Sequence, residues 1–201
     1  MEQLSFFDGA QGLKLPVDLM DYRPGFFNRN ESADLMEALK QTINWQQETI
    51  QMYGKLLTTP RLTAWYGDNH KTYAFSGKKF DPHPWTPELL SIKQRVDEAV
   101  GIAFNSVLLN DYRNGNDSVA WHADDEPELG LNPTIASVSF GQVRRFDVRH
   151  KLDHKLKYSV ELQNGSLLIM KGDLQHHWEH QVPKSTRALK ERINLTFRVI
   201  S

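Results

Sequence analysis

The chain contains no cysteine among its 201 residues. This absence excludes disulfide bonds, thiol nucleophiles, iron–sulfur clusters and cysteine-ligated zinc, so any metal must bind histidine, aspartate or glutamate. Long apolar runs are also absent, and 39% hydrophobic with 24% charged residues is typical of a globular protein rather than a membrane-spanning or disordered one. No basic segment followed by an apolar run begins at Met1, so we expect a cytosolic or nuclear protein without a membrane partner.

A net charge of −1 hides an uneven distribution of charge along the chain. Residues 1–50 carry eight acidic and four basic side chains, whereas residues 142–157 carry six basic and two acidic ones. Phe146, His150 and His154 are interleaved with these basic residues. A basic stretch with interleaved rings suits a polyanion, and a solvated surface face is the alternative.

Two helices are predicted in the N-terminal half, after a tail without regular elements over residues 1–29. The first helix begins at a cap at Asn30 and continues through apolar residues at helical spacing, which are Leu35, Leu39 and Ile43. The second has Thr86 as its cap and Pro87 at its first helical position. Loops or hairpins with glycine and lysine lie between the two helices.

From about Phe104 the apolar pattern changes to a period of two residues. Short β-prone runs, separated by glycine, asparagine and aspartate, predict strands at 106–112, 135–140, 145–148, 158–162, 166–170 and 192–200. Two helices followed by six or more short strands predict an α+β protein whose C-terminal half is an antiparallel sandwich or barrel.

Histidine and aspartate lie two residues apart at His122 and Asp124, so on an extended segment both side chains point to the same face. A second histidine group follows at His176, His177 and His180. Two histidines and one carboxylate, without cysteine, match the facial triad of non-haem Fe(II) oxygenases, which leaves coordination positions open for substrate and dioxygen. A hydrolytic zinc site of two histidines and one aspartate is the alternative.

Residues 192–198 alternate polar and apolar side chains, so a strand here has one face of each kind. The polar face consists of Arg192, Asn194, Thr196 and Arg198. Two arginines that face the inside of a barrel are costly unless anions pair with them, and a dicarboxylate would meet both. Asn110 and Tyr112, two residues apart on another predicted strand, would add an amide and a phenol.

Together these segments resemble the AlkB family of Fe(II)- and 2-oxoglutarate-dependent nucleic-acid dioxygenases, and within it the duplex-DNA repair members. The resemblance runs from about Gly54 to the C-terminus. It rests on motifs at 60–68, 73–77, 110–112, 122–126, 135–141, 177–183 and 192–198.

The resemblance implies a double-stranded β-helix, or jelly roll, over residues 104–201. Residues 30–103 would hold the helices and a hairpin lid for nucleotide recognition, and 30–201 would form one folded unit. Fe(II) and 2-oxoglutarate are the implied cofactors. The implied iron ligands are His122, Asp124 and His180. The residues implied to bind 2-oxoglutarate are Asn110, Tyr112, Arg192, Asn194, Thr196 and Arg198, of which Arg192 and Arg198 count with the iron ligands as catalytic.

The implied activity is oxidative demethylation of N-alkylated bases in DNA, such as 1-methyladenine and 3-methylcytosine. Iron and dioxygen convert 2-oxoglutarate to succinate and CO₂, and the hydroxylated methyl group leaves as formaldehyde. A base in a duplex reaches such a site only when it is flipped out of the stack. The residues implied to contact the substrate are Tyr53, Gly54, Lys55, Tyr73, Ala74, Phe75 and Asp125.

Nucleic acid as the partner would give the basic stretch a function. Phosphates would pass along the strand pair beside the site and the facing hairpin, where the basic residues are Arg144, Arg145, Arg149, Lys151, Lys78 and Lys79. An oxygenase of the same chemistry that acts on RNA or single-stranded nucleic acid is the main alternative. Two further alternatives are an inactive nucleic-acid-binding module and a zinc hydrolase. The first should have lost a metal ligand or an arginine, and none is lost. The second does not explain two arginines that face the inside of the barrel.

The residues from Gln3 to Phe7 resemble the short peptide by which bacterial repair enzymes bind the replicative sliding clamp. Such peptides bind as extended segments with apolar side chains in a groove. The alternative is an apolar tail that covers the domain itself. With a clamp peptide we expect a bacterial cytoplasmic protein near the nucleoid, and otherwise a nuclear one; a monomer is expected in both cases.

Overall fold

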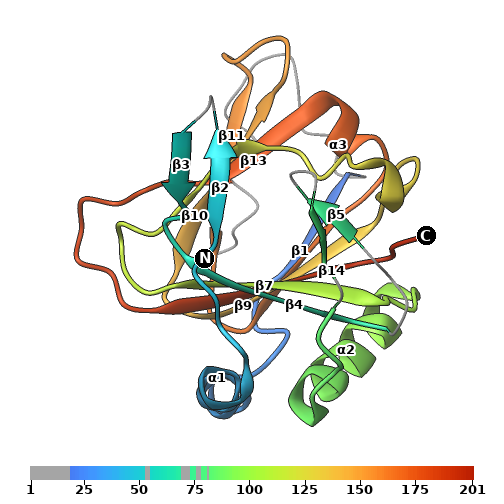
Figure 1. Cartoon of the computed structure of the whole chain (residues 1–201), viewed down its shortest axis with the longest axis vertical. Coiled ribbons are helices and arrows are strands. Elements are labelled where there is room, and N and C mark those ends of the chain that lie inside the picture. The colour runs from blue at the N-terminus through green and yellow to red at the C-terminus, as the bar shows by residue number, and fades with distance from the viewer. Residues whose placement is uncertain (1–18, 53–54, 69–72, 76–77, 81) are drawn as a thin grey trace.

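The computed structural model describes residues 19–52, 55–68, 73–75, 78–80 and 82–201, and in it two antiparallel sheets face each other (Figure 1). The larger sheet contains, in spatial order, β1 (Met20–Arg23), β12 (Ser166–Met170), β9 (Ile135–Gly141), β14 (Arg192–Arg198), β7 (Ser106–Tyr112) and β4 (Leu62–Gly67). The smaller sheet contains β11 (Lys157–Leu162), β10 (Arg144–His150), β13 (Trp178–Val182) and β8 (Val119–His122). The predicted α+β chain with an antiparallel C-terminal half is confirmed.

Helix α1 (Arg29–Thr42) begins at a capping box rather than at the predicted cap Asn30. The side chain of Asn28 accepts the backbone N–H of Glu31 at 3.0 Å, and the Glu31 carboxylate accepts the N–H of Asn28 at 2.7 Å. The prediction was two residues late, because both asparagines suit a cap but only Asn28 has a glutamate three residues later.

Helix α2 (Pro87–Val100) begins as predicted. Thr86 Oγ1 accepts the backbone N–H of Leu89 at 3.3 Å, and Pro87 occupies the first position, where a missing N–H costs nothing. The helix ends at Gly101, whose φ of 75° lies in the left-handed region that favours glycine.

Apolar side chains form two clusters, one on each face of the larger sheet. The outer cluster joins the helices to β7 and β14 and includes Leu39, Leu89, Ile92, Val96, Val107, Leu109, Ile193, Leu195 and Phe197. The inner cluster lies between the two sheets and includes Tyr112, Phe146, Val148, Leu168, Met170 and Trp178. The larger sheet is therefore a middle layer, with α1 and α2 on one side and the smaller sheet on the other (Figure 1).

Strand β14 lies inside this middle layer and pairs antiparallel with β7 and with β9. In its register with β7, Arg192 lies opposite Tyr112 and Asn194 lies opposite Asn110. Its apolar residues belong to the outer cluster, so the polar residues between them face the space between the sheets. The predicted division of 192–198 into a polar and an apolar face is confirmed.

The predicted tail over residues 1–29 is wrong for its last part. Strand β1 pairs with β12 at the edge of the larger sheet, and Phe27 is buried in the outer cluster. Met20 and Tyr22 alternate with charged residues in β1, but four residues are too few to establish a period. The sequence also missed β8 and β13, which are equally short.

Two hairpins and two short segments complete the description. The hairpins expected between the helices are β2 (Thr49–Met52) with β3 (Lys55–Thr58), and β5 (Tyr73–Phe75) with β6 (Lys78–Phe80). A 3₁₀ turn at Pro127–Leu129 and a short helix α3 (Leu174–His177) precede β9 and β13. Among the described residues no helix is long and apolar enough to cross a membrane. Residues 3–7, the expected clamp peptide, lie outside the description.

Asp111 is a buried carboxylate on the outer face of β7, away from the polar face of β14. It is 5% exposed and lies opposite Ile193 and Leu62, and its Oδ1 has no hydrogen-bond partner among the described residues. Burial, followed by the charge of Glu191, raises the pKa of Asp111 to about 7. Above that pH the folded chain must hold an unsatisfied buried charge.

We expect Asp111→Asn to stabilise the protein at pH 8 and to have little effect below pH 4. The folded pKa is above the unfolded one, so wild-type stability is full below the unfolded pKa and falls as the pH rises towards about 7. Chemical denaturation should show a gain of roughly 2 kcal/mol for the variant at pH 8. The exposed Asp34→Asn is the control, and an equal gain at pH 4 and pH 8 would contradict the assignment.

Candidate metal centre and anion pocket

His122, Asp124 and His180 come together between the two sheets. His122 ends β8 and lies opposite His180 of β13 in the strand register, with ring centroids 4.3 Å apart. One potential ligand atom from each of the three residues lies within 4.8 Å of the others. Asp124 and His180 are buried and His122 is partly exposed, so the group has one side towards the interior and one towards solvent. Such a donor set can hold one metal ion and leave coordination positions open.

Burial and nearby charges keep Asp124 and His180 in the forms that bind metal. Burial acts to raise the pKa of Asp124, but Arg198 and the two histidines outweigh it and hold the pKa well below its ordinary value. Arg198 Nη2 donates to Asp124 Oδ2 at 2.8 Å. Burial, followed by the charge of His122, lowers the pKa of His180 to about 3, so its imidazole is neutral. A carboxylate and a neutral imidazole are the protonation states of metal ligands.

Gln175 links the two chain segments that carry the triad, and the sequence alone did not single it out. It lies in α3 just before β13, is 1% exposed, and accepts the backbone N–H of Asp124 at its Oε1 at 2.9 Å. Its Nε2 contacts Met170 Sδ at 3.7 Å. A side chain from the His180 segment therefore fixes the backbone of the Asp124 segment. No spacing rule signals such a contact, because the acceptor serves a backbone group 51 residues away.

Arg192 forms a cationic pocket on the inner face of β14. It is 1% exposed, and its Nη2 donates to Ser139 Oγ at 3.0 Å. Its Nε and Nη1 are buried and have no hydrogen-bond partner among the described residues. The ring of Tyr112 lies 5.1 Å from the guanidinium carbon, and burial lowers the pKa of Arg192 to about 10, which leaves it charged at neutral pH. Two open donors on one planar fork suit a carboxylate.

The two arginines of β14 differ in their hydrogen-bond partners within the protein. Both were predicted to await an anion, but Arg198 already pairs with Asp124, so only Arg192 has open donors. Between them on the same face, Asn194 donates to Ser137 Oγ at 2.9 Å and to the Val138 carbonyl, and Thr196 donates to Asn194 Oδ1 at 3.2 Å. The polar face thus runs from an open cation at one end to the triad at the other.

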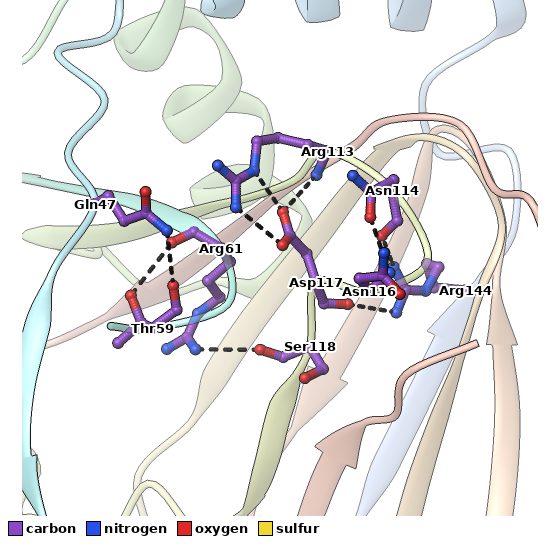
Figure 2. Close-up of polar contacts among 9 residues, drawn as sticks. All are labelled: Gln47, Thr59, Arg61, Arg113, Asn114, Asn116, Asp117, Ser118 and Arg144. Atoms are coloured by element: carbon purple, nitrogen blue, oxygen red, sulfur yellow. Dashed lines mark hydrogen bonds and ion pairs between the residues drawn. The ribbon is translucent and has the colours of Figure 1, made fainter. Parts of the chain in front are cut away.

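Arg61 holds Asn110, which was predicted to belong to the anion pocket with Arg192 and Tyr112. Its Nε donates to Asn110 Oδ1 at 2.6 Å. Its Nη1 donates to the Ser118 carbonyl at 3.3 Å, the contact that Figure 2 shows. Arg61 lies in one of the family motifs, but sequence analysis assigned it no function. It connects the start of β4 to β7 and to the segment before β8, and so fixes the side-chain oxygen of Asn110.

The basic stretch at 142–157 differs from the prediction, because four of its six basic side chains are held by partners within the protein. Arg144 is 2% exposed and donates to the carbonyls of Asn114, Asp117 and Pro183, so it cannot reach a phosphate (Figure 2). Other basic side chains form ion pairs, namely Arg145 with Asp147, Arg149 with Glu179, and Lys151 with Asp125. Charge counting revealed the cations but not their partners.

The residues expected around the substrate base are only partly placed. Tyr53 and Gly54 lie outside the described residues, Lys55 begins β3, and Tyr73–Phe75 form β5. Asp125 directly follows the triad residue Asp124, and its carboxylate accepts Lys151 Nζ at 2.8 Å. Contacts of these residues with a base stay predictions. His176 and His177, which had no predicted ligand role, are not part of the metal-binding group.

We expect Gln175→Met to weaken metal binding at the triad about tenfold or more, because it removes the acceptor that holds the Asp124 backbone while keeping side-chain volume. Mn²⁺ or Co²⁺ titration of the apoprotein, followed spectroscopically, measures this without turnover. Asp124→Ala, which removes a ligand, is the reference for lost binding. Thermal unfolding of both variants checks that they fold, and wild-type affinity in Gln175→Met would contradict the role.

The chain matches the family described as the 2OG-Fe(II) oxygenase superfamily over residues 20–198. It is 42% identical over 185 residues to human alpha-ketoglutarate-dependent dioxygenase alkB homolog 3, covering 88% of this chain and 64% of that protein. It is 40% identical over 185 residues to mouse DNA oxidative demethylase ALKBH2, covering 87% of this chain and 77% of that protein. The chain therefore spans just under two thirds of the length of the alkB homolog 3 relative.

Two solved structures share the fold. The structure of OsALKBH1 aligns with a TM-score of 0.62 at 19% identity, over 89% of this chain and 97% of that one. An oxidoreductase of the 2OG-Fe(II) oxygenase family from Burkholderia pseudomallei aligns with a TM-score of 0.56 at 12% identity, over 89% and 84% of the two chains. This likeness concerns the fold, and it confirms the predicted jelly roll.

The cofactors named in the family description, Fe(II) and 2-oxoglutarate, were predicted from the sequence, and the residues present fit both. The triad supplies two imidazoles and a carboxylate within reach of one ion. Arg192 supplies two buried donors that nothing else among the described residues satisfies. Motifs, fold and relatives agree, and the chain belongs to the AlkB family of the 2OG-Fe(II) oxygenase superfamily.

Proposed function

We propose that this protein is a DNA repair dioxygenase that removes methyl groups from N-alkylated bases such as 1-methyladenine and 3-methylcytosine. The observation that carries the proposal is the buried Arg192 guanidinium, whose open donors share one interior face with Arg198 and the triad. A hydrolytic zinc site would leave this cation without a purpose. The names of the ALKBH2 relatives, DNA oxidative demethylase, support the choice of DNA.

In this proposal His122, Asp124 and His180 hold Fe(II). The residues that bind 2-oxoglutarate are Asn110, Tyr112, Arg192, Asn194, Thr196 and Arg198, with Arg192 on the distal carboxylate. The bound iron and 2-oxoglutarate supply the oxidation of the methyl group by dioxygen.

The chain itself orients the groups that hold them. Arg198 fixes the carboxylate of Asp124 through the contact at 2.8 Å, so one of its oxygens has a defined direction. The ring of Phe146 lies 5.1 Å from that of His180 and shields this imidazole from water on the side of the smaller sheet. Arg192, buried and charged, binds a carboxylate without the competing hydration of an exposed cation.

The proposed substrate contacts follow from the position of Asp125 and of the two hairpins. A base methylated at N1 of adenine or N3 of cytosine is cationic, and a carboxylate at Asp125 would favour it. The β2-β3 and β5-β6 hairpins would border a flipped base through Tyr53, Gly54, Lys55, Tyr73, Ala74 and Phe75. Binding of the sliding clamp through residues 3–7 is a separate proposal, as is a monomeric state. DNA as substrate would place the protein in a bacterial cytoplasm or a nucleus.

RNA or single-stranded nucleic acid is the second candidate substrate class. The alkB homolog 3 relatives, at 40–42% identity, are as similar to this chain as the ALKBH2 relatives, and their names specify a dioxygenase without naming DNA. The chemistry is the same for both classes. The two classes differ in how the hairpins would contact the strand. Substrate preference is therefore tested by comparing DNA and RNA substrates of the same sequence.

We expect the buried cation of Arg192 to couple 2-oxoglutarate binding to stability. With Mn²⁺ in place of iron and 2-oxoglutarate at about 100 times its Kd, the wild-type Tm should rise by about 5 to 10 °C. Arg192→Met keeps the volume and removes the unsatisfied charge, so it should fold at least as stably without ligand but lose this shift. Arg23→Met, which breaks the partly exposed pair with Asp21, is the control that should keep it. A full shift in Arg192→Met would contradict the pocket.

Turnover is tested by anaerobic loading with Fe(II) and 2-oxoglutarate, followed by oxygen and an oligonucleotide with one 1-methyladenine or 3-methylcytosine. Single-stranded DNA, duplex DNA and RNA versions are compared, and the repaired base is scored by mass. We expect repair of DNA, with succinate and formaldehyde formed in step, and none with His122→Ala. Repair of RNA alone would replace the first candidate by the second. Succinate without any repaired base would contradict both.

A further inference from the structure

The connection between β10 and β11 exposes a leucine to solvent. Leu152 is 92% exposed, the highest exposure of any large apolar side chain among the described residues. A leucine in water contributes nothing to the core and carries an unfavourable hydration cost. Single exposed apolar residues are common, so the argument depends on how Leu152 is held and on what lies beside it.

Hydrogen bonds fix the shape of the turn that carries Leu152. The ring Nδ1 of His150 accepts the backbone N–H of Leu152 and that of Asp153, both at 3.2 Å. The Asp153 carbonyl accepts the N–H of Leu156 at 3.0 Å, and the Leu156 carbonyl accepts that of His150 at 3.0 Å. Leu152 is thus presented by an ordered turn rather than by a loose loop.

The same turn is attached to both segments that carry the triad. The backbone N–H of Lys151 donates to the His177 carbonyl at 2.8 Å, and its Nζ donates to Asp125 at 2.8 Å. Asp125 directly follows one triad residue, and His177 lies three positions before another, His180. Leu152 therefore sits one residue from the rim of the candidate site. Figure 1 shows this connection, in orange, projecting beyond the two sheets at the top of the view.

Charge in the turn favours an anionic partner. Residues 150–157 contain three lysines, at 151, 155 and 157, and one aspartate, Asp153. Lys151 pairs with Asp125, so Lys155 and Lys157 carry the charge that has no ion-pair partner among the described residues. The carboxylate of Asp153 is directed inward to the turn, where it accepts the backbone N–H of Lys155 at 3.0 Å. An apolar side chain among lysines matches a nucleic-acid strand, whose phosphates meet cations and whose bases and sugars offer apolar faces.

We propose that the 150–157 turn is a nucleic-acid contact in which Leu152 packs against a base or sugar next to the nucleotide held in the site. The proposal rests on the proposed function, since it takes the strand in the site to be nucleic acid. It adds an apolar contact on the smaller-sheet side of the triad, separate from the hairpins that precede α2. Lys155 and Lys157 contribute attraction to phosphate, and Leu152 contributes contact with one nucleotide.

The test uses Leu152→Ser, which removes the apolar side chain at a position without packing partners to disturb. Binding of fluorescent oligonucleotides with one 1-methyladenine, single-stranded and duplex, is measured by anisotropy with Mn²⁺ and 2-oxoglutarate present. We expect about fivefold weaker binding to at least one of them, with an unchanged dependence on salt. Lys155→Ser should instead lower the salt dependence by about one ion. Leu90→Ser on α2, on the far side of the larger sheet, is the matched control.

Because the chain has no cysteine, Leu152→Cys and Leu90→Cys each give a single labelling site. An environment-sensitive fluorophore at position 152 should shift to shorter wavelength when the oligonucleotide binds, whereas the label at position 90 should not respond. Wild-type affinity in Leu152→Ser, or a silent label at position 152, overturns the inference. If wild-type protein loaded with Fe(II) and 2-oxoglutarate repairs the same oligonucleotides after oxygen is added, only the inference fails. If it neither binds nor repairs any oligonucleotide, the proposed function fails.

Discussion

A strand that is buried on both faces must satisfy every polar group it carries, and β14 carries a cation there. Arg192 is 1% exposed, yet the protein supplies partners for only part of its guanidinium among the described residues. The outer cluster holds the apolar half of the strand in place, so Arg192 cannot turn towards solvent. The unpaired charge therefore lowers the stability of the folded chain until an anionic ligand binds. A rigid scaffold that holds such a charge in place is a preorganised binding site.

The triad illustrates a different solution to the same problem. Asp124 is also buried, but Arg198 and two histidines surround it, and Gln175 accepts its backbone N–H. Each of these groups comes from a different element: β14, the neighbouring strands β8 and β13, and α3. The position of the carboxylate is therefore determined by several independent attachments, and small motions of any one element are restrained by the others.

Periodicity in the sequence was sufficient to predict six of the ten strands of the two main sheets and the two faces of β14. The pair His122 and Asp124 could be found because two-residue spacing fixes a common side, whereas only the family resemblance separated His180 from His176 and His177. Gln175 could not be found, since its function depends on a backbone group across the fold. Arg144 was misjudged for a related reason: its sequence neighbours are basic, but its three carbonyl partners come from distant segments. Local pattern reports local geometry, whereas burial and pairing are set by the tertiary structure.

The position of β14 in the chain has a consequence for folding. It is the last strand described, yet it lies between β7 and β9, and residues paired with β7 are 80 to 92 positions apart in sequence. The middle layer therefore closes only after β14 has been synthesised, and until then β7 and β9 each have one unpaired edge. Such long-range pairing is intrinsically slow to form. Loss of the final strand would remove the cation pocket and the closure of the sheet together.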